Sequence, residues 1–251
     1  MLESRPEPAD FFPKIIPFAF PGIPGVSCFF STALYGDISL DAGRPGGEAA
    51  GRRAGLSRLL GFASWTELRQ AHGDLLLKDP EPTPFDAPSD KEADGTCSSR
   101  PGQALLVKAA DCQQILLAHK SGRYVAALHC GWKGNALDFP GKGLAAFCRA
   151  YALSPAEVLA VRGPSLGPGA AEFVNFELEW PERFRPWFNP ATRNMDLWSL
   201  TRSQLLAAGL LPEHFFTLDL CTYTFSGEEA GFLFSYRRGH AGRQAALIFI
   251  N

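Results

Sequence analysis

A few histidine and cysteine positions are the residues of this chain most able to do chemistry. Of the five histidines, His72 and His129 each stand beside a glycine or a Cys-Gly pair at an expected strand boundary, and Cys112 directly precedes an expected buried strand. Two imidazoles and one thiolate, with a fourth position open, are the ligands of a catalytic zinc site. A water in the open position would lose its proton more readily than bulk water does. The three residues are far apart in sequence, so their types suggest a metal site that their spacing alone does not establish.

The same side chains fit other chemistries. Cys112 with a histidine such as His129 nearby could be the nucleophile of a hydrolase. A Cys-His-His set also resembles a blue-copper centre, although a multicopper enzyme needs more imidazoles than the five in this chain. A closed zinc site in an interaction domain is the non-enzymatic alternative.

The stretch 104–134 has to position Cys112 and His129. It contains three short apolar segments that predict strands, and Ser121-Gly122 between the last two is typical of a hairpin turn. Cys112 stands just before the middle strand, and the third strand ends on His129. A thiol and an imidazole are therefore expected at the ends of neighbouring strands. The predicted strands are 104–107, 115–118 and 124–128.

Short apolar strands alternate with a few helices along the rest of the chain, and no internal repeat or composition shift marks a second domain. We predict a single mixed α and β domain over residues 1–251, with Asp196 capping a helix. Residues 79–103, rich in Pro, Asp, Ser and Gly, predict a long loop. The predicted helices are 52–62, 142–153 and 197–209, and the further strands are 26–31, 75–77, 158–161, 215–218, 231–236 and 245–250.

Residues 163–167, GPSLG, match the G-x-S-x-G nucleophile elbow of serine hydrolases. That motif requires a helix directly after the serine, and Pro168-Gly169 is unfavourable for one. We therefore predict a tight glycine-rich loop near a substrate, with Ser165 as a nucleophile the less favoured reading.

Composition excludes several classes of protein. The chain has 251 residues, 46% of them hydrophobic, and a formal net charge of -2, which does not favour nucleic acid or an anionic membrane as a partner. No apolar run has the length of a membrane span, and the first residues lack the pattern of a signal peptide, which predicts a cytoplasmic protein. The six cysteines include no CxxC pair and are expected to be free thiols.

Four separate blocks of sequence carry a resemblance to a known family. QAHG, AADCQQILL, ALHCGWKG and SYRRGHAGRQ follow one another in this order. Together they resemble the laccase-domain proteins, also called multicopper polyphenol oxidoreductases or peptidoglycan-editing factors, and the match runs from about Phe18 to the C-terminus. The resemblance implies an α+β fold of layered mixed β-sheets flanked by helices (α/β/β/α). It also implies that the metal ligands are His72, Cys112 and His129.

The same resemblance implies a purine nucleoside phosphorylase with added adenosine deaminase activity. Its cofactor would be zinc, with copper as the alternative. Its partners would be a purine nucleoside and phosphate, with no nucleic acid and no membrane, and the chain would be a monomer or a homodimer. The nucleosides would be adenosine, inosine, guanosine or methylthioadenosine. The alternatives, in order, are a hydrolase that edits peptidoglycan precursors through Cys112 and His129, and a copper-dependent polyphenol oxidase.

Phosphorolysis needs cations near the phosphate, and deamination needs a carboxylate that can move a proton. The candidate cations are Lys133, Arg237 and Arg243, with Arg238 beside them. Lys133 stands where the family commonly has arginine, so the charge is kept and the planar fork of donors is lost. Asp111 could shuttle a proton or orient a metal ligand. The other candidate carboxylates are Asp94 and Glu172, which, like Lys133, Arg237 and Arg243, are expected to bind the substrate.

Overall fold

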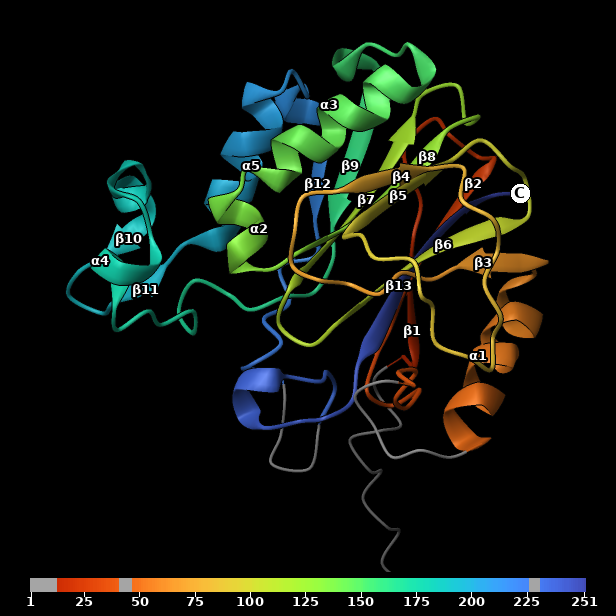
Figure 1. Ribbon diagram of the computed structural model, residues 1–251, viewed down its shortest axis with the longest axis horizontal. Helices are drawn as coiled ribbons and strands as arrows, with labels where there is room; N and C mark the ends of the chain where they lie inside the picture. Colours follow the sequence, from red (N-terminus) through yellow and green to blue (C-terminus); the bar gives the residue numbers. More distant parts are fainter. Residues whose placement is uncertain (1–12, 41–46, 226–230) are drawn as a thin grey trace, which may run out of the picture.

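The computed structural model describes residues 13–40, 47–225 and 231–251. Its body consists of two mixed sheets packed face to face, with helices on the outer faces (Figure 1). The first sheet has the order β1 (Ile15–Phe18), β2 (Val26–Ser31), β13 (Gln244–Ile250), β6 (Gln103–Ala109) and β3 (Ser64–Thr66). The second has the order β12 (Phe215–Thr217), β9 (Val158–Arg162), β7 (Gln113–His119), β8 (Val125–Cys130), β5 (Gly95–Ser98) and β4 (Leu76–Lys78).

The central strands form because their sequences are apolar on both faces, as expected for strands covered on two sides. Every residue of β6, β7, β8 and β13 is buried. Alternate side chains meet between the sheets, where Val107 of β6 and Leu116 of β7 belong to one apolar cluster. The main core therefore lies between the sheets, and it fixes how the strand ends around the site are aligned.

Helices cover the outer face of each sheet. Helix α1 (Gly47–Leu60) packs Leu56 against Leu106 and Leu247 of the first sheet. Helices α3 (Phe139–Tyr151) and α5 (Leu197–Ala207) cover the second sheet on its far side. The predicted N-cap of α5 is present, since an oxygen of the Asp196 carboxylate accepts a hydrogen bond of 2.9 Å from the Ser199 N–H.

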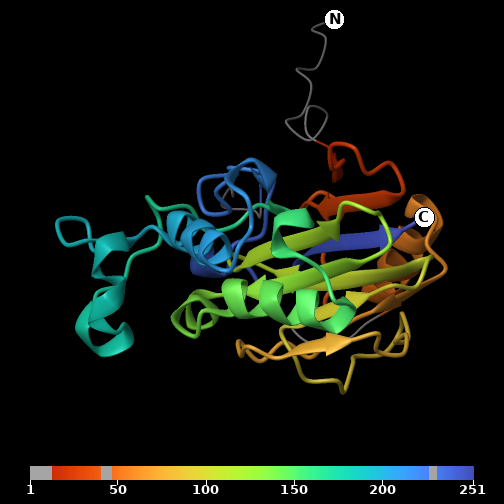
Figure 2. The ribbon, with the colours of Figure 1, turned by 90° about the horizontal axis from the view of Figure 1, so that it is seen from above.

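A small arm extends from the body between β9 and α5 and stands apart in both views (Figures 1 and 2). Its aromatic side chains form their own cluster around Phe176 and Trp180. The arm contains α4 (Phe176–Glu179), η3 (Glu182–Trp187), β10 (Phe188–Asn189) and β11 (Asn194–Met195). The remaining short elements are α2 (Trp132–Ala136), η2 (Pro155–Glu157), η4 (Pro212–His214) and η5 (Tyr236–Arg238).

The layered α/β/β/α arrangement confirms the expected α+β fold. Two local predictions are wrong. Residues 231–236 form no strand, because the Phe234 N–H is bonded by the side chain of Gln244 instead of by a neighbouring backbone, and η5 begins at Tyr236. The stretch 79–103 is not one continuous loop, because Gly95–Ser98 forms the buried strand β5. The residues of β5 (GTCS) are small and not strongly apolar, so the sequence shows no strand pattern there.

All six cysteines are free thiols, as expected. Within the described ranges, no helix has both the length and the apolar character needed to cross a membrane.

Candidate metal centre

One cavity of about 990 Å³ collects most of the residues that the sequence singles out. Drug-sized and cofactor-sized ligands occupy cavities of about 300–1,000 Å³, so a nucleoside fits within this volume. Its polar lining includes His72, Lys108, Asp111, Cys112, His129, Lys133, Arg237 and Arg243. Its apolar lining includes Trp132, Leu166, Phe173, Leu197 and Tyr236.

Strand pairing brings the thiol and one imidazole together. Strands β7 and β8 are antiparallel, and their register places Gln113 opposite Cys130 and Gln114 opposite His129. Cys112, one residue before β7, therefore lies beside the end of β8. His129 lies inside β8, one residue before its end, so the strand continues one residue beyond the histidine on which it was expected to end.

His72 reaches the same place from the loop between β3 and β4. It has a positive φ of 61°, an unusual conformation for a residue with a side chain. Asp111 beside Cys112 also has a positive φ, of 91°. Backbone of this kind is held in place by its surroundings and is concentrated at functional sites.

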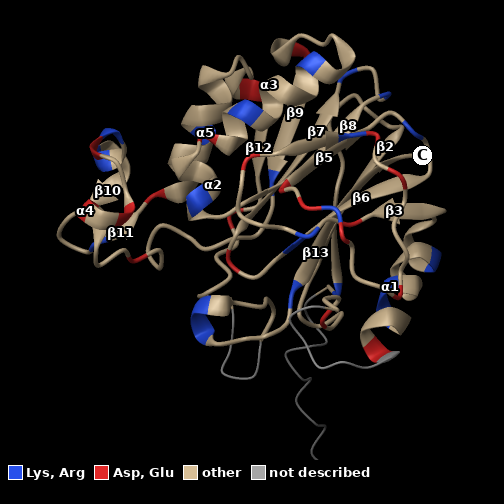
Figure 3. Cartoon of the chain, viewed as in Figure 1, with Lys and Arg blue, Asp and Glu red and all other residues tan. Residues whose placement is uncertain are grey.

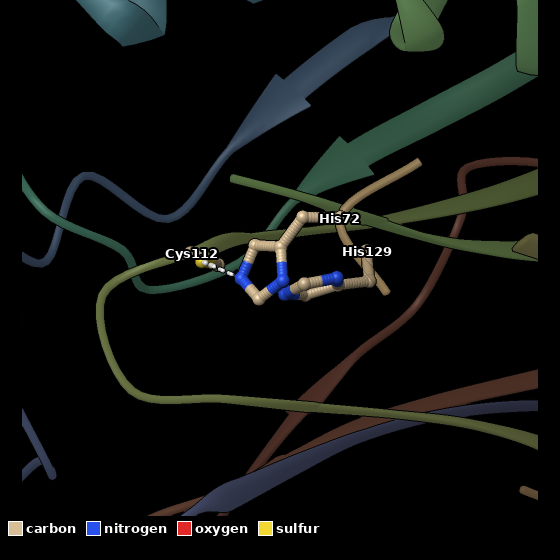
Figure 4. Close-up of side chains that lie close together, drawn as sticks. All are labelled: His72, Cys112 and His129. Atoms are coloured by element: carbon tan, nitrogen blue, oxygen red, sulfur yellow. Dashed lines mark hydrogen bonds between the residues drawn. The ribbon is translucent and has the colours of Figure 1, made fainter. Parts of the chain in front are cut away.

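The three candidate ligands converge on one point (Figure 4). Their ligand atoms all lie within 4.8 Å of one another, and Cys112 Sγ is 3.8 Å from His72 Nε2. Ligand atoms on one tetrahedral zinc are separated by roughly 3.4 Å, from the usual bond lengths. A small inward movement of the side chains is thus sufficient to hold an ion. The three residues that the sequence singles out as candidate ligands are the ones that the fold places close together.

Gly131, which follows β8, leaves the space that these ligands need. A β-carbon at this position would lie 2.9 Å from Cys112 Sγ and 2.9 Å from His72 Cδ2. Both distances are shorter than a normal contact. Any side chain at residue 131 would therefore push the ligands apart.

Asp94 at the start of β5 orients both histidines. One carboxylate oxygen accepts from His129 Nδ1 at 2.8 Å and from the His72 N–H at 2.9 Å. The other accepts from the N–H groups of Ala71, at 3.1 Å, and Gly73, at 2.6 Å. Because Nδ1 of His129 faces this carboxylate, Nε2 is the nitrogen turned toward Cys112 and available to a metal.

These contacts also set the pKa values. Burial alone would raise the pKa of Asp94, but its hydrogen bonds from His129 and the 71–73 loop outweigh that effect, and its pKa is lowered. Burial would likewise raise the pKa of Cys112, yet the charge and hydrogen bonds of His129 and His72 lower it to about 6. Burial would lower the pKa of His129, whereas Cys112 and Asp94 raise it to about 9. At neutral pH the metal-free site therefore holds a thiolate next to an imidazolium.

Asp111 ties three segments together at the cavity wall. Its carboxylate accepts from the Thr222 hydroxyl at 2.7 Å and from the Arg237 N–H at 2.7 Å. Its backbone carbonyl accepts from the Leu166 N–H at 2.8 Å. Both of its carboxylate oxygens are thus engaged in holding loops, an arrangement suited to positioning.

The structure separates the other predicted substrate residues into two groups. Lys133, Arg237 and Arg243 line the cavity. Asp94 is 1% exposed behind the histidines, and Glu172 pairs with Arg193 at 2.5 Å in the arm, so neither carboxylate is part of the lining. Arg238 is directed away, with its guanidinium 4.2 Å from the ring centroid of Tyr223.

The Ser165 hydroxyl is occupied by hydrogen bonds within the protein interior. Ser165 is fully buried, and its hydroxyl accepts hydrogen bonds from Trp198 Nε1 at 2.9 Å and from the Arg162 guanidinium at 3.1 Å. A turn follows it, not a helix. The predicted tight loop is therefore present, and its Leu166 lines the cavity.

Sequence reasoning missed Lys108 and Gln70, which also line the cavity. The Gln70 side chain bonds the backbone N–H of Lys108 at 2.8 Å and its carbonyl at 2.7 Å, and so fastens the 69–73 loop to β6. One signal was available. Lys108 is the single charge in the otherwise uncharged strand QALLVKA.

Known proteins resemble this chain in both sequence and fold. The family model described as multi-copper polyphenol oxidoreductase laccase matches residues 37–251. The purine nucleoside phosphorylase YfiH of Escherichia coli is 34% identical over 194 residues, covering 73% of this chain and 72% of the relative. A purine nucleoside phosphorylase of Xylella fastidiosa is 32% identical over 248 residues, covering 91% of this chain and 89% of the relative.

The solved structure of YlmD from Geobacillus stearothermophilus has the same fold, with a TM-score of 0.76 at 23% identity, over 92% of this chain and 94% of that one. Residues 37–251, which match the family model, include His72, Cys112, His129 and the rest of the cavity lining. This chain therefore belongs to the multi-copper polyphenol oxidoreductase laccase family.

Proposed function

We propose that this protein is a zinc-dependent purine nucleoside phosphorylase that also deaminates adenosine. Adenosine, inosine, guanosine or methylthioadenosine would react with phosphate to give the free base and a pentose 1-phosphate. The observation that carries the proposal is the convergence of His72, Cys112 and His129 in a cavity of nucleoside size. It is supported by relatives that are named purine nucleoside phosphorylases.

The donor set suits a zinc ion. Cys112 would offer its thiolate, His129 its Nε2 and His72 an exposed ring on the cavity side. When bound, zinc supplies Lewis acidity, which polarises an oxygen and lowers the pKa of a coordinated water. Asp94 would keep His129 in the tautomer that binds metal.

The rest of the cavity would bind and orient the reactants. In phosphorolysis a phosphate oxygen bonds to the sugar C1′ while the bond from C1′ to the base breaks, and the base leaves with the electron pair. We propose that Lys133, Arg237 and Arg243 attract the phosphate, since cations with several donors suit its oxygens. Trp132 and Phe173 form an aromatic pair at 5.8 Å that would bind the flat face of the base.

Asp111 would act as a positioning residue in this mechanism, because both of its oxygens hold neighbouring loops. Glu172 would act at a distance through Arg237, whose guanidinium donates to the Glu172 backbone carbonyl at 3.1 Å. We propose that residues 1–251 act as one catalytic domain, as a monomer or a homodimer.

Two observations favour second candidates. The lowered pKa of Cys112 beside His129 would also serve a thiol hydrolase acting on peptidoglycan precursors. The description of the family model, together with a Cys-His-His set, would suit a copper-dependent polyphenol oxidase.

One set of measurements separates these candidates. Purified protein is analysed for metal, then incubated with adenosine with and without phosphate, and the products are separated by chromatography. We expect the protein to contain zinc. Adenine should form only when phosphate is present, and inosine should form whether or not phosphate is added. Cys112→Ala should abolish both products and the metal, whereas His214→Ala, at a partly buried histidine of η4, should change neither. Copper with a visible thiolate absorption, or no nucleoside product at all, would contradict the proposal.

A further inference from the structure

Lys108 is a buried lysine that no proposed step has used. It lies near the end of β6, is only 7% exposed, and reaches the cavity that contains the metal centre. A lysine is rarely buried without a specific partner, because removing an ammonium from water is costly. A lysine in this position therefore requires an explanation from its surroundings.

A buried chain of charges fixes the Lys108 ammonium. Its Nζ is 2.5 Å from one carboxylate oxygen of Glu67, which is 1% exposed and follows β3. The other oxygen of Glu67 pairs with Arg53 of α1, which is fully buried. The Arg53 guanidinium lies 4.8 Å from the ring centroid of Trp65. The ammonium is thus held by groups that are themselves buried and paired.

Arg243 brings a second cation to the same side of the cavity. In the β6–β13 register Lys108 pairs with Ala245, so Arg243 lies two residues from the position opposite Lys108. Its guanidinium donates to the carbonyls of Ala241, at 2.7 Å, and Gly242, at 3.0 Å. Ion pairs among the described residues do not include Arg243. Two further basic residues, Arg237 and Arg238, belong to the neighbouring short helix η5 (Figure 3).

We propose that Lys108 joins Arg243 to form the subsite that holds inorganic phosphate, with Glu67 and Arg53 as positioning residues. Lys133 and Arg237 line the same cavity and attract phosphate toward this subsite. This inference rests on the proposed function, and it assigns phosphate, the second substrate of that reaction, to a specific part of the cavity. Two fixed cations at a partly desolvated wall attract a dianion more strongly than exposed lysines do. Lys108 and Cys112 are four positions apart in the sequence, at most roughly 14 Å of extended chain, so one nucleoside can reach both ends.

The test measures phosphate binding directly and through kinetics. Titration calorimetry of the zinc-loaded protein with inorganic phosphate needs no turnover, so it still decides the subsite if no nucleoside is cleaved. We expect Lys108→Met to weaken phosphate binding at least tenfold and to raise the KM for phosphate by the same factor. The KM for adenosine should change less than threefold.

Matched variants separate this role from a structural one. Lys108→Arg keeps the charge and should recover most of the phosphate affinity. Lys142→Met removes an exposed lysine that pairs with Asp74 outside the cavity, and it should have no effect. Arg243→Gln leaves the Glu67 pairs intact and should also weaken phosphate binding tenfold, so it decides the matter if Lys108→Met does not fold.

Two results would overturn the assignment. Unchanged phosphate affinity in the folded variants, or in Arg243→Gln alone if Lys108→Met is unfolded, would show that phosphate binds elsewhere. Adenosine 5′-monophosphate is titrated in parallel. A loss of affinity for this nucleotide with no loss for inorganic phosphate would assign the subsite to a 5′-phosphate and contradict our proposal.

Discussion

At the scale of single residues, the candidate centre depends on groups that hold the ligands as much as on the ligands themselves. Asp94 receives four hydrogen bonds and links the loop of His72 to the ring of His129. Sequence reasoning selected Asp94 but assigned it to substrate or proton transfer, because a strand start does not reveal which backbone N–H groups surround a carboxylate. The candidate ligands could be chosen from their residue types together with the family resemblance, and the fold brings them within reach of one another.

Asp94→Asn should weaken zinc binding by about 10–100-fold, the usual effect of losing a group that orients a metal-bound histidine. The amide keeps the size of the side chain but places an NH2 group against N–H donors and no longer fixes the His129 tautomer. Competition with a chromophoric chelator measures the affinity. Asp74→Asn, at an exposed carboxylate paired with Lys142, is the control. Wild-type zinc affinity in Asp94→Asn would contradict the orienting role.

In metal-free protein, alkylation of Cys112 by iodoacetamide should rise with pH through a midpoint near 6, because its pKa is lowered to about 6. An unfolded cysteine would show a midpoint near 9. The thiolate–imidazolium pair is lost below about pH 6, when the thiolate is protonated. It is lost above about pH 9, when His129 loses its proton. It therefore stabilises the metal-free fold between these values.

Mass spectrometry of the labelled peptide follows the alkylation rate, and Cys112→Ser removes the signal. A midpoint near 9 in the folded protein would show that the two histidines do not stabilise the thiolate.

At the scale of elements, the centre is assembled by strand register and by close backbone approach. Apolar content predicted β2, β6, β7, β8, β9 and β13. All of these except β2 are buried along their whole length, and β2 alternates buried residues with the half-buried Ser27 and Phe29, so each leaves a clear sequence pattern. Neither the order of the strands nor the pairing of β7 with β9 could be predicted, since several apolar strands are interchangeable in pattern. Gly163 shows how tightly the strands pack, because a β-carbon there would lie 2.2 Å from Cε1 of the buried Phe30.

Gly163→Ala should therefore lower the free energy of unfolding by about 1–3 kcal/mol or more, since Phe30 is fully buried and has no space to move. Denaturant titration followed by fluorescence measures the change. Gly169→Ala is a matched control in the same loop, because a β-carbon there meets no atom within 4 Å. Equal stability of the two variants would mean that β9 and β2 separate more easily than their packing indicates.

At the scale of the whole molecule, both sheets and the arm contribute to one cavity. The first sheet supplies Lys108, the second supplies His129, and Phe173 comes from the start of the arm. The layered α+β arrangement could be expected from the resemblance and the alternation of elements. The role of the arm could not, because its aromatic residues have no strand or helix periodicity and pack mainly against one another.

Zinc should raise the Tm of the metal-free protein, because the ion would join the 69–73 loop to β8. At a free concentration a hundred times the Kd, a ligand adds about 2.7 kcal/mol to the stability of the folded state. For a domain of this size that corresponds to a rise of roughly 5–10 °C. Differential scanning calorimetry measures the shift, and Cys112→Ser should show almost none. An equal rise in both proteins would mean that zinc binds elsewhere.

The unequal burial of the candidate ligands has a consequence for how metal is exchanged. His129 is 3% exposed and braced by Asp94, whereas His72 is exposed on a loop. An ion would therefore leave by releasing His72 first, while Cys112 and His129 still hold it. The rate at which a chelator removes the metal should then follow the opening of the loop that carries His72. Metal would enter and leave on the side of the site where His72 lies.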